Sequence, residues 1–404
     1  MLRRGDGVKP AGRIRISGFR GAGAACGIKK SAKPDLALVV SGLPCVSDVV
    51  FTRNRVFAAP VAWGKALRGH AALRGVIVNS GNANACTGEE GLSAVRTTSA
   101  AACAALGLPP GSLLVSSTGV IGVPLPAGKI VAALPGLCAS LSADGIARAG
   151  DAILTTDAWP KRGVRRVAVR GGRVTLGGIA KGAGMIAPNM GTMLAYVFTD
   201  ASVRPADLRR AFRGAVDLSF NRIVVDGDTS TNDTAAIFAN GACGLSPLAG
   251  KDLAAFSEAL RSLLLDLALL IVRDGEGATR VVRMEVTGAA NGRDAERAAR
   301  AVATSPLVKT AVFGADLNWG RVVAAVGRAG IRIDPERVEL TFAGEKVLLR
   351  GMEIDRAALR RAAPKIRKEA YGIEMDLGLG KGSHHVYFSD LNHDYVRINA
   401  GYRT

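Results

Sequence analysis

The chain has 404 residues, of which 48% are hydrophobic, so it is long enough to bury a sizeable core in two or more lobes. Its formal net charge is +19, from 53 basic and 34 acidic residues. Because the basic residues are scattered and only 5% of the chain is aromatic, nucleic-acid binding is the weaker interpretation of this charge. A positive field also suits small carboxylate substrates.

The cysteines and histidines argue against disulfide and metal frameworks. The six cysteines form no CxxC pair, and we expect them to be buried, reduced thiols of a cytosolic protein without a secretory leader. The four histidines show no HExxH spacing, so neither a zinc site nor a histidine-based triad is expected. The longest apolar run, 263–272, is interrupted by Asp266 and is too short to span a bilayer, which favours a soluble protein.

The sequence predicts short strands separated by glycine-rich loops in the first part of the chain. The Ile14/Ile16 alternation predicts a strand after a basic tail, and further strands are expected at 36–40, 49–51 and 76–79. The last of these ends in N-S-G-N-A-N-A-C-T-G, before a helix over 89–106. Backbone N–H groups are free at such a junction, so it is a common ligand site, although a well-capped turn explains the loop equally well.

A second strand-to-turn junction occupies L-L-V-S-S-T-G-V-I-G, residues 113–122. A hydroxyl- and glycine-rich turn can direct a hydroxyl and a backbone N–H toward one point, as an oxyanion hole for acyl transfer requires. Taken alone, S-S-T-G is an ordinary turn. The chain then passes through a helix that ends near residue 154, the string T-T-D, and a hairpin over 165–176 that turns at Gly171-Gly172.

The central stretch K-G-A-G-M-I-A-P-N-M-G-T-M-L-A, residues 181–195, carries the most specific chemistry. A glycine-rich loop runs into Thr192, and an apolar strand follows. A threonine at a strand edge suits self-cleavage: its hydroxyl attacks the carbonyl of Gly191, and water releases a new N-terminus. The freed α-amine can then act as a base for the hydroxyl. For the Gly-Thr dipeptide alone, a turn before a buried strand is the simpler interpretation.

Beyond this stretch the pattern is mixed helix and strand. Expected elements are helices over 205–218, 253–271 and 293–303, strands over 194–199, 281–286 and 307–313, a helix after 314, and a basic helix over 356–371. The loop D-G-D-T-S-T-N-D, residues 226–233, lacks the glutamate and spacing of a calcium loop and is predicted to be a rigid, hydrogen-bonded loop beside the site. Glu276, between two glycines at a helix-to-strand turn, would ordinarily be a solvated turn residue.

The stretch 181–195 resembles the self-cleavage segment of the ornithine acetyltransferase family, the bifunctional glutamate N-acetyltransferases of arginine biosynthesis. N-S-G-N-A-N, S-T-G, T-T-D, D-G-D-T-S-T-N-D, G-E-G-A-T and the closing residues 390–404 match that family in the same order. The chain departs at Gly191, where alanine is usual, at Ala187, at Leu317, and over 383–389 and 392–393. The resemblance covers nearly the whole chain.

The resemblance implies the roles of individual residues. Thr192 would be the nucleophile, with cleavage between Gly191 and Thr192, and Thr118 (hydroxyl) and Gly119 (backbone N–H) would form the oxyanion pair. Glu276 would contact substrate. Substrate-binding positions implied in addition are Thr155 or Thr156, Lys181, Thr192, Asn399 and Thr404. As hypotheses, Lys181 would pair with a substrate carboxylate and Glu276 with the ornithine ammonium.

The resemblance also implies the architecture and the reaction. The expected fold is a mixed-sheet α/β sandwich with a smaller C-terminal lobe over about 331–404, although periodicity alone supports only an α/β chain with a second lobe. Self-cleavage would give an α chain (1–191) and a β chain (192–404) that pair as (αβ)2. The enzyme would pass the acetyl group of N2-acetylornithine to L-glutamate, without metal or cofactor, and the use of acetyl-CoA as a second donor stays open.

Two other functions remain. A self-processing N-terminal-threonine amidohydrolase or aminopeptidase would use water as the acceptor and would hydrolyse without transfer to glutamate. A non-catalytic basic binding protein would stay a single chain and would bind polyanions with strong salt dependence.

Overall fold

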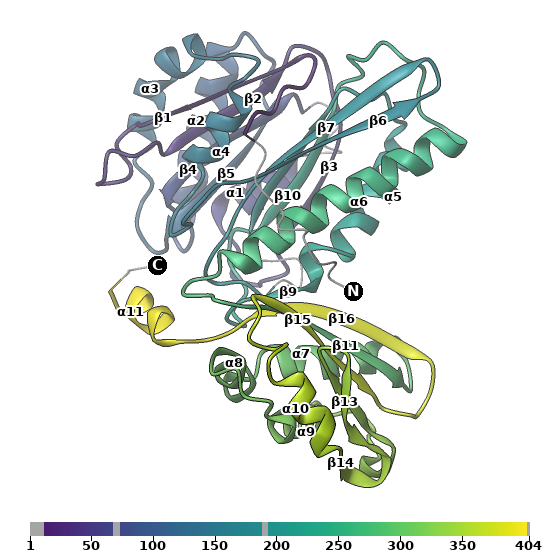
Figure 1. Ribbon diagram of the computed structural model, residues 1–404. Helices are drawn as coiled ribbons and strands as arrows, with labels where there is room; N and C mark the ends of the chain where they lie inside the picture. Colours follow the sequence, from purple (N-terminus) through teal and green to yellow (C-terminus); the bar gives the residue numbers. More distant parts are fainter. Residues whose placement is uncertain (1–11, 68–72, 188–192, 402–404) are drawn as a thin grey trace. The chain divides into compact units, whose positions relative to one another are not determined.

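The computed structural model describes residues 12–67, 73–187 and 193–401 (Figure 1). The proposed cleavage site, Gly191-Thr192, and the predicted substrate-binding Thr404 lie outside the described residues. The chain forms two compact units: a larger one of residues up to 221 together with 228–271, and a smaller one of 222–227 together with 272–401. The segment from residue 331 onward, expected as a lobe, lies within the smaller unit, which also takes in the chain from residue 272.

Two β-sheets form the centre of the larger unit. The first has the order β1-β2-β4-β5 and the second β3-β10-β8-β7-β6. Their bounds are β1 Phe19–Ala24, β2 Leu36–Ser41, β4 Gly75–Asn82, β5 Leu113–Val120, β3 Val46–Phe51, β10 Thr234–Ala239, β8 Leu194–Thr199, β7 Gly172–Lys181 and β6 Lys161–Val169. Within these sheets β4 pairs in parallel with β5 and β8 with β10, whereas the other neighbours are antiparallel.

The facing surfaces of the two sheets form one apolar core. Val39, Val78 and Leu114 of the first sheet pack with Phe198 and Phe238 of the second. The rings of Phe198 and Phe238 stack with their centroids 5.7 Å apart. Strands β8 and β10 are buried along their whole length, which explains their nearly continuous apolar sequences.

Helices cover the outer faces of this sandwich, except for α4, Ile146–Ala152, which contacts both sheets and packs into the core between them (Figure 1). The helices of the unit are α1 Ala59–Ala66, α2 Gly88–Ala105, α3 Ala127–Ala139, α4 Ile146–Ala152, α5 Pro205–Asp217 and α6 Gly250–Arg273. Helices α2 and α3 pack on the first sheet through a second apolar cluster. Helix α6 packs on the second sheet at Gly163 and Gly178, where an added Cβ would come within 2.5 Å of Leu263 and 2.8 Å of Leu267. The glycines therefore let the helix approach the strands closely.

The smaller unit is a seven-stranded sheet with helices on one face. Its strand order is β14-β13-β12-β15-β11-β16-β9. Its elements are β9 Ile223–Val224, β11 Val281–Ala289, α7 Gly292–Ala303, α8 Pro306–Phe313, α9 Trp319–Gly327, β12 Glu339–Phe342, β13 Glu345–Leu349, β14 Glu353–Ile354, α10 Arg356–Ala362, β15 Ala370–Asp376, β16 Gly382–Ser389 and α11 His393–Gly401. Residues of α7 to α10 share one apolar core with the sheet.

The predicted α/β sandwich is confirmed, together with most of the expected elements. The hairpin of β6 and β7 turns at Gly171-Gly172, and α5, α6 and α7 match their predicted ranges within a few residues. Among the described helices, none has the length and hydropathy that crossing a membrane requires.

Four local predictions are wrong. Residues 307–313 form helix α8, because Ser305 caps its N-terminus and Pro306 occupies its first turn, and a short apolar run does not distinguish helix from strand. The basic helix ends at Ala362, and β15 begins at Ala370, because Pro364 cannot continue the helix. Residues 13–16 form no strand, although Ile14 and Ile16 are buried in the sandwich core. Not every thiol is buried: Cys45 and Cys103 are, but Cys86 lies exposed in the loop before α2.

Candidate functional site

The predicted oxyanion turn lies at the end of β5, where this strand pairs with β4. Thr118 is opposite Ser80 and Gly119 is opposite Gly81, and the register becomes irregular at the next residue. Gly119 has a φ of +132°, and an added Cβ would lie only 2.3 Å from the carbonyl carbon of Gly81. This conformation and this close approach both require glycine. The glycine of S-T-G is therefore fixed by the geometry of the bulged strand end.

Lys181 and Thr118 are brought together from different sheets. Lys181 is the last residue of β7, and its Nζ donates a hydrogen bond of 3.0 Å to the Thr118 hydroxyl. A hydroxyl that accepts from an ammonium group can direct its own hydrogen to another acceptor. Thr118 is thereby oriented as a hydrogen-bond donor beside a positive charge, as stabilisation of an oxyanion requires.

The string T-T-D is organised by a buried carboxylate. Asp157 accepts hydrogen bonds from the N–H of Thr155 at 3.0 Å and of Gly182 at 2.7 Å, and it pairs with Lys161 Nζ at 2.5 Å. Burial would raise the pKa of Asp157, but the charges of Lys161 and Lys181 outweigh this effect and lower it to about 2. Asp157 thus ties the Thr155-Thr156 turn to the start of the glycine-rich loop.

The asparagine loop that follows β4 serves as a scaffold. Asn79 accepts from the Ser117 hydroxyl at 2.6 Å and donates to the carbonyl of Asn82 at 2.8 Å. Asn82 donates to the carbonyl of Val123 at 3.1 Å, and Asn84 donates to the carbonyl of Gly91 at 2.9 Å. These amides hold the loop against the oxyanion turn, which favours the capped-turn interpretation of the asparagine side chains.

Residues 229–233, Thr229-Ser230-Thr231-Asn232-Asp233, are the threonine-rich loop, and in this part of the string 226–233 the predicted hydrogen bonding is observed. The Thr229 hydroxyl donates to the carbonyl of Ala187 at 3.1 Å. Asn232 Nδ2 donates to the carbonyls of Ser117 at 2.8 Å and Ala83 at 2.6 Å. The loop therefore contacts the glycine-rich loop on one side and the strand that carries Thr118 on the other.

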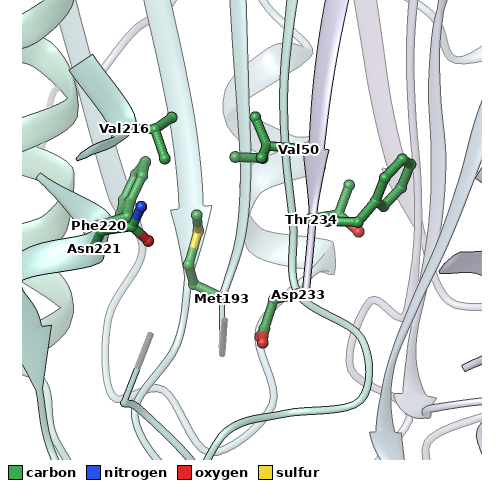
Figure 2. Close-up of a pocket in the computed structure, with 9 residues that line it drawn as sticks. Val50, Met193, Val216, Phe220, Asn221, Asp233 and Thr234 are labelled. Atoms are coloured by element: carbon green, nitrogen blue, oxygen red, sulfur yellow. The ribbon is translucent and has the colours of Figure 1, made fainter. Parts of the chain in front are cut away.

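Asp233 is the last residue of the threonine-rich loop and is only 4% exposed. It lies beside Met193 in a small cavity lined mainly by apolar side chains (Figure 2). Burial raises the pKa of Asp233 well above its usual value, against the opposing influence of the Met193 N–H and the Lys181 charge. Nothing in the sequence predicts this burial, since an aspartate in a polar loop is usually solvated.

In the smaller unit, Glu276 and Asn399 form the second group of predicted site residues. Asn399 Nδ2 donates to Glu276 Oε2 at 2.7 Å and to the carbonyl of Tyr395 at 3.0 Å. Glu276 is only 8% exposed, so the solvated-turn interpretation does not hold. The two residues, more than 120 positions apart, present one carboxylate that an amide orients from α11.

The turn that carries Glu276 is held by the closing residues of the chain. Asp390 accepts from the N–H of Thr279 at 2.8 Å, from its hydroxyl at 2.6 Å, and from the N–H of Arg280 at 2.9 Å. Asn392 Nδ2 donates to the carbonyl of Gly277 at 2.6 Å. These contacts give the D-L-N string of residues 390–392 a structural role.

Lys309, on α8, is a buried amine behind this turn. It is 2% exposed and donates to the carbonyl of Ser389, next to Asp390. Burial lowers its pKa to about 7, although the nearby charges of Asp390 and Asp226 oppose the shift. The sequence does not single out Lys309, because it lies inside an apolar run that predicts a strand. Within the part of the chain that the structure describes, no cluster of three or more potential metal ligands occurs.

Comparison with known proteins places this geometry in context. Residues 20–404 match the model of the ArgJ family. The arginine biosynthesis bifunctional protein ArgJ of Geobacter sulfurreducens is 48% identical over 393 residues, which cover 97% of this chain and 100% of that protein. The protein of the same name from Thermus thermophilus is 45% identical over 393 residues, covering 96% of this chain and 98% of its own length.

Solved structures give two further likenesses. The crystal structure of ArgJ from Bacillus halodurans is 39% identical with a TM-score of 0.48, and it covers 51% of this chain and 98% of that chain. The structure of the Mycobacterium tuberculosis ornithine acetyltransferase, complexed with ornithine, is 40% identical with a TM-score of 0.38, and it covers 43% of this chain and 93% of that chain.

Proposed function

The chain belongs to the ArgJ family of arginine-biosynthesis acyltransferases, and from this premise we propose that it transfers the acetyl group of N2-acetylornithine to L-glutamate through an ester on Thr192. The observation that carries this proposal is the hydrogen bond from Lys181 to Thr118. It supplies an oriented hydroxyl donor and a positive charge at the end of β5, next to the glycine-rich loop that leads toward Thr192. Acyl transfer needs these features, and a non-catalytic binding protein does not.

The proposed activation is self-cleavage. The Thr192 hydroxyl adds to the Gly191 carbonyl, the carbon–nitrogen bond breaks, and the hydroxyl proton passes to the departing nitrogen. Water then hydrolyses the ester and leaves a carboxylate on Gly191 and a free α-amine on Thr192. The products are the α chain (1–191) and the β chain (192–404), which we propose stay associated as (αβ)2.

The proposed transfer has two half-reactions. The α-amine of Thr192, with a pKa of roughly 8, accepts the hydroxyl proton as the oxygen attacks the acetyl carbonyl. The Thr118 hydroxyl and the Gly119 N–H stabilise the oxyanion, at about 3 kcal/mol per donor. The proton passes to the departing ornithine amine. The glutamate amine then attacks the threonine ester and regenerates the hydroxyl.

Substrate recognition is proposed for the remaining site residues. Lys181 binds the substrate carboxylate, and Glu276, oriented by Asn399, binds the ornithine ammonium. Further contacts come from the Thr155-Thr156 turn and from Thr404. The chemistry requires no metal or cofactor, acetyl-CoA would serve only as an additional acetyl donor, and we place the reaction in the cytoplasm.

Intact-mass spectrometry of the wild type beside Thr192→Ala tests the activation. We expect two fragments that split between Gly191 and Thr192 in the wild type, and one chain in Thr192→Ala. Thr341→Ala, on β12, is the matched control and should be cleaved like the wild type. A single wild-type chain would overturn the mechanism.

An assay of acetyl transfer from N2-acetylornithine to glutamate, with and without acetyl-CoA, tests the reaction itself. We expect acetylglutamate and ornithine in equal amounts. Release of acetate without acetylglutamate would identify a threonine amidohydrolase instead.

A further inference from the structure

The threonine-rich loop contacts the chain on both sides of residues 188–192. Thr229 donates to the carbonyl of Ala187, before this segment, at 3.1 Å. The N–H of Thr234, directly after the loop, donates to the carbonyl of Met193 at 3.0 Å. Asn232 reaches the carbonyl of Ser117, next to Thr118, at 2.8 Å. One short loop therefore connects both flanks of the proposed cleavage site with the oxyanion strand.

Within this loop the carboxyl of Asp233 faces the Met193 N–H and the Thr52 hydroxyl, which favour its charged form, but one of its two oxygens is unpaired. Its Oδ2 is buried and has no hydrogen-bond partner. A buried polar atom without a partner costs about 1–3 kcal/mol and needs an explanation, because most such atoms in folded proteins are paired. Leucine would fill the same space without this cost. The free-energy cost of the unpaired oxygen is understandable if the carboxyl acts on the neighbouring segment of the same chain.

The segment next to the Asp233 carboxyl is the start of β8. Strands β8 and β10 pair in parallel with Thr234 opposite Leu194, so the preceding residues, Asp233 and Met193, also lie side by side. Both line the same small cavity, and Figure 2 shows the carboxyl at the Met193 end of it. Met193 is covalently joined to Thr192, so a contact at Met193 lies one peptide bond from the proposed nucleophile.

We infer that Asp233 is a positioning residue for Thr192, whose carboxyl holds the main chain at Met193 in the geometry that self-cleavage and acetyl transfer require. This inference rests on the proposed function, because it assumes that Thr192 is the nucleophile. It gives the D-G-D-T-S-T-N-D string a role in the reaction: Thr229 and Asp233 hold the chain before and after residues 188–192.

The chemical state of the carboxyl agrees with this role. Burial favours the uncharged acid, and the positive charge of Lys181 and the Met193 N–H only partly oppose it. An uncharged carboxyl carries an O–H donor as well as acceptor oxygens. It can therefore accept a hydrogen bond from one main-chain group and donate one to another, which a carboxylate cannot do. Asparagine shares this dual capacity and leucine does not.

The test compares Asp233→Asn with Asp233→Leu. We expect Asp233→Leu to slow self-cleavage by about 100-fold, since small displacements of reacting groups have effects of this size. For the fraction of Asp233→Leu that is cleaved, kcat should fall while KM stays near the wild-type value. Asp233→Asn should restore cleavage to within about 10-fold of the wild type. Rescue by the isosteric amide is a result that a loss of packing would not give.

Asp48→Asn is the matched control. Asp48 is another buried aspartate of the same sheet, on β3, where it is bound by Arg213 from α5 at 2.9 Å. Its replacement should lower the thermal midpoint without slowing cleavage. If Asp233→Leu does not fold, Asp233→Ala replaces it in the comparison with Asp233→Asn.

The outcomes distinguish a failure of this inference from a failure of the proposed function. A folded Asp233→Leu that cleaves and turns over like the wild type would overturn the inference, and so would equal losses in Asp233→Asn and Asp233→Leu. A slowing of cleavage in Asp48→Asn as large as in Asp233→Leu would assign the loss to general destabilisation. A wild-type chain that neither cleaves nor transfers acetyl would instead refute the proposed function.

Discussion

The ammonium group of Lys181 and the hydroxyl of Thr118 are hydrogen-bonded between the two sheets of the larger unit, with 3.0 Å between Nζ and Oγ1. The two residues come from β7 of one sheet and β5 of the other. The lysine proposed to bind the substrate carboxylate therefore also orients the hydroxyl proposed to stabilise the oxyanion. The proposed substrate binding and the proposed transition-state stabilisation are linked through this one contact.

Substitution of Lys181 by methionine should affect both kinetic parameters. We expect a higher KM for acetylornithine and for glutamate, because both carry an α-carboxylate. The kcat should fall by about 10- to 100-fold as Thr118 loses its orienting partner. Lys129→Met, which removes an exposed ammonium that binds the carbonyl of Gly27, is the control. An unchanged KM would rule out carboxylate binding by Lys181, and an unchanged kcat would rule out the orienting role.

Glu276→Gln should discriminate between the two substrates. The amide keeps a hydrogen-bond acceptor for Asn399 but removes the charge that is proposed to pair with the ornithine ammonium. We expect the KM for acetylornithine to rise about 10-fold and that for glutamate to change less, since charge-assisted hydrogen bonds are the stronger ones. Steady-state kinetics with each substrate varied in turn measures this. Glu374→Gln, at an exposed position of β15, should change neither, and equal rises in both constants would contradict the assignment.

The sequence predicted best the parts of the fold where local pattern and burial agree. Strand β8 is apolar along its length and is buried throughout, and the β6–β7 hairpin turns at the predicted glycines. Local pattern failed at α8, where the cap at Ser305, rather than the apolar run, decides the conformation. The resemblance supplied the site residues, and the structure pairs Lys181 with Thr118 and Glu276 with Asn399.

The residues that hold the site could not be predicted from the sequence. Asp157, Lys161, Asp233 and Lys309 are charged side chains, and charged residues are rarely buried, so nothing in their own segments predicts their burial. Their burial depends on partners that are distant in sequence, such as Ser389 for Lys309. A contact of this kind depends on how the strands and helices pack, and no spacing within the chain specifies it.

The buried pair of Asp157 and Lys161 should contribute strongly to stability. Asp157→Asn leaves the fully buried Lys161 ammonium without its charge partner, and such a loss typically costs about 3–5 kcal/mol. Urea unfolding at pH 7 measures the difference. The double variant Asp157→Asn/Lys161→Met should recover part of it. Asp151→Asn, which breaks a partly exposed pair with Arg162, should cost less than about 1 kcal/mol.

The same carboxylate predicts an acid-sensitive stability. The pKa of Asp157 in the folded chain is about 2, below the value of about 3.9 for an unfolded chain. Its contribution is therefore present above pH 4 and is lost as the pH falls toward 2, where the folded state must take up the proton. Asp157→Asn should lose less stability than the wild type between these pH values. Parallel acid profiles for the two proteins would contradict this prediction.

Lys309 predicts a change of the same sign at alkaline pH, because its pKa is also lowered in the folded chain. Its pKa is lowered to about 7 by burial, whereas an unfolded lysine titrates near pH 10.4. Below pH 7 the folded state carries the full cost of a buried ammonium, and between pH 7 and 10 the unfolded chain binds the extra proton, so the free energy of unfolding rises with pH. Lys309→Met should flatten this rise, measured by urea unfolding at pH 7, 8.5 and 10.

Lys346→Met, which removes a half-exposed ammonium paired with Glu339, is the control for Lys309→Met and should keep the wild-type slope. Lys29, whose pKa burial lowers to about 8, contributes a rise of the same sign in both variants, so the difference between the two slopes isolates Lys309. Equal slopes in Lys309→Met and the wild type would mean that the amine is not titrating in the folded state. A smaller slope only in Lys309→Met would establish a neutral amine behind Asp390, where it supports the Glu276 turn without a buried charge.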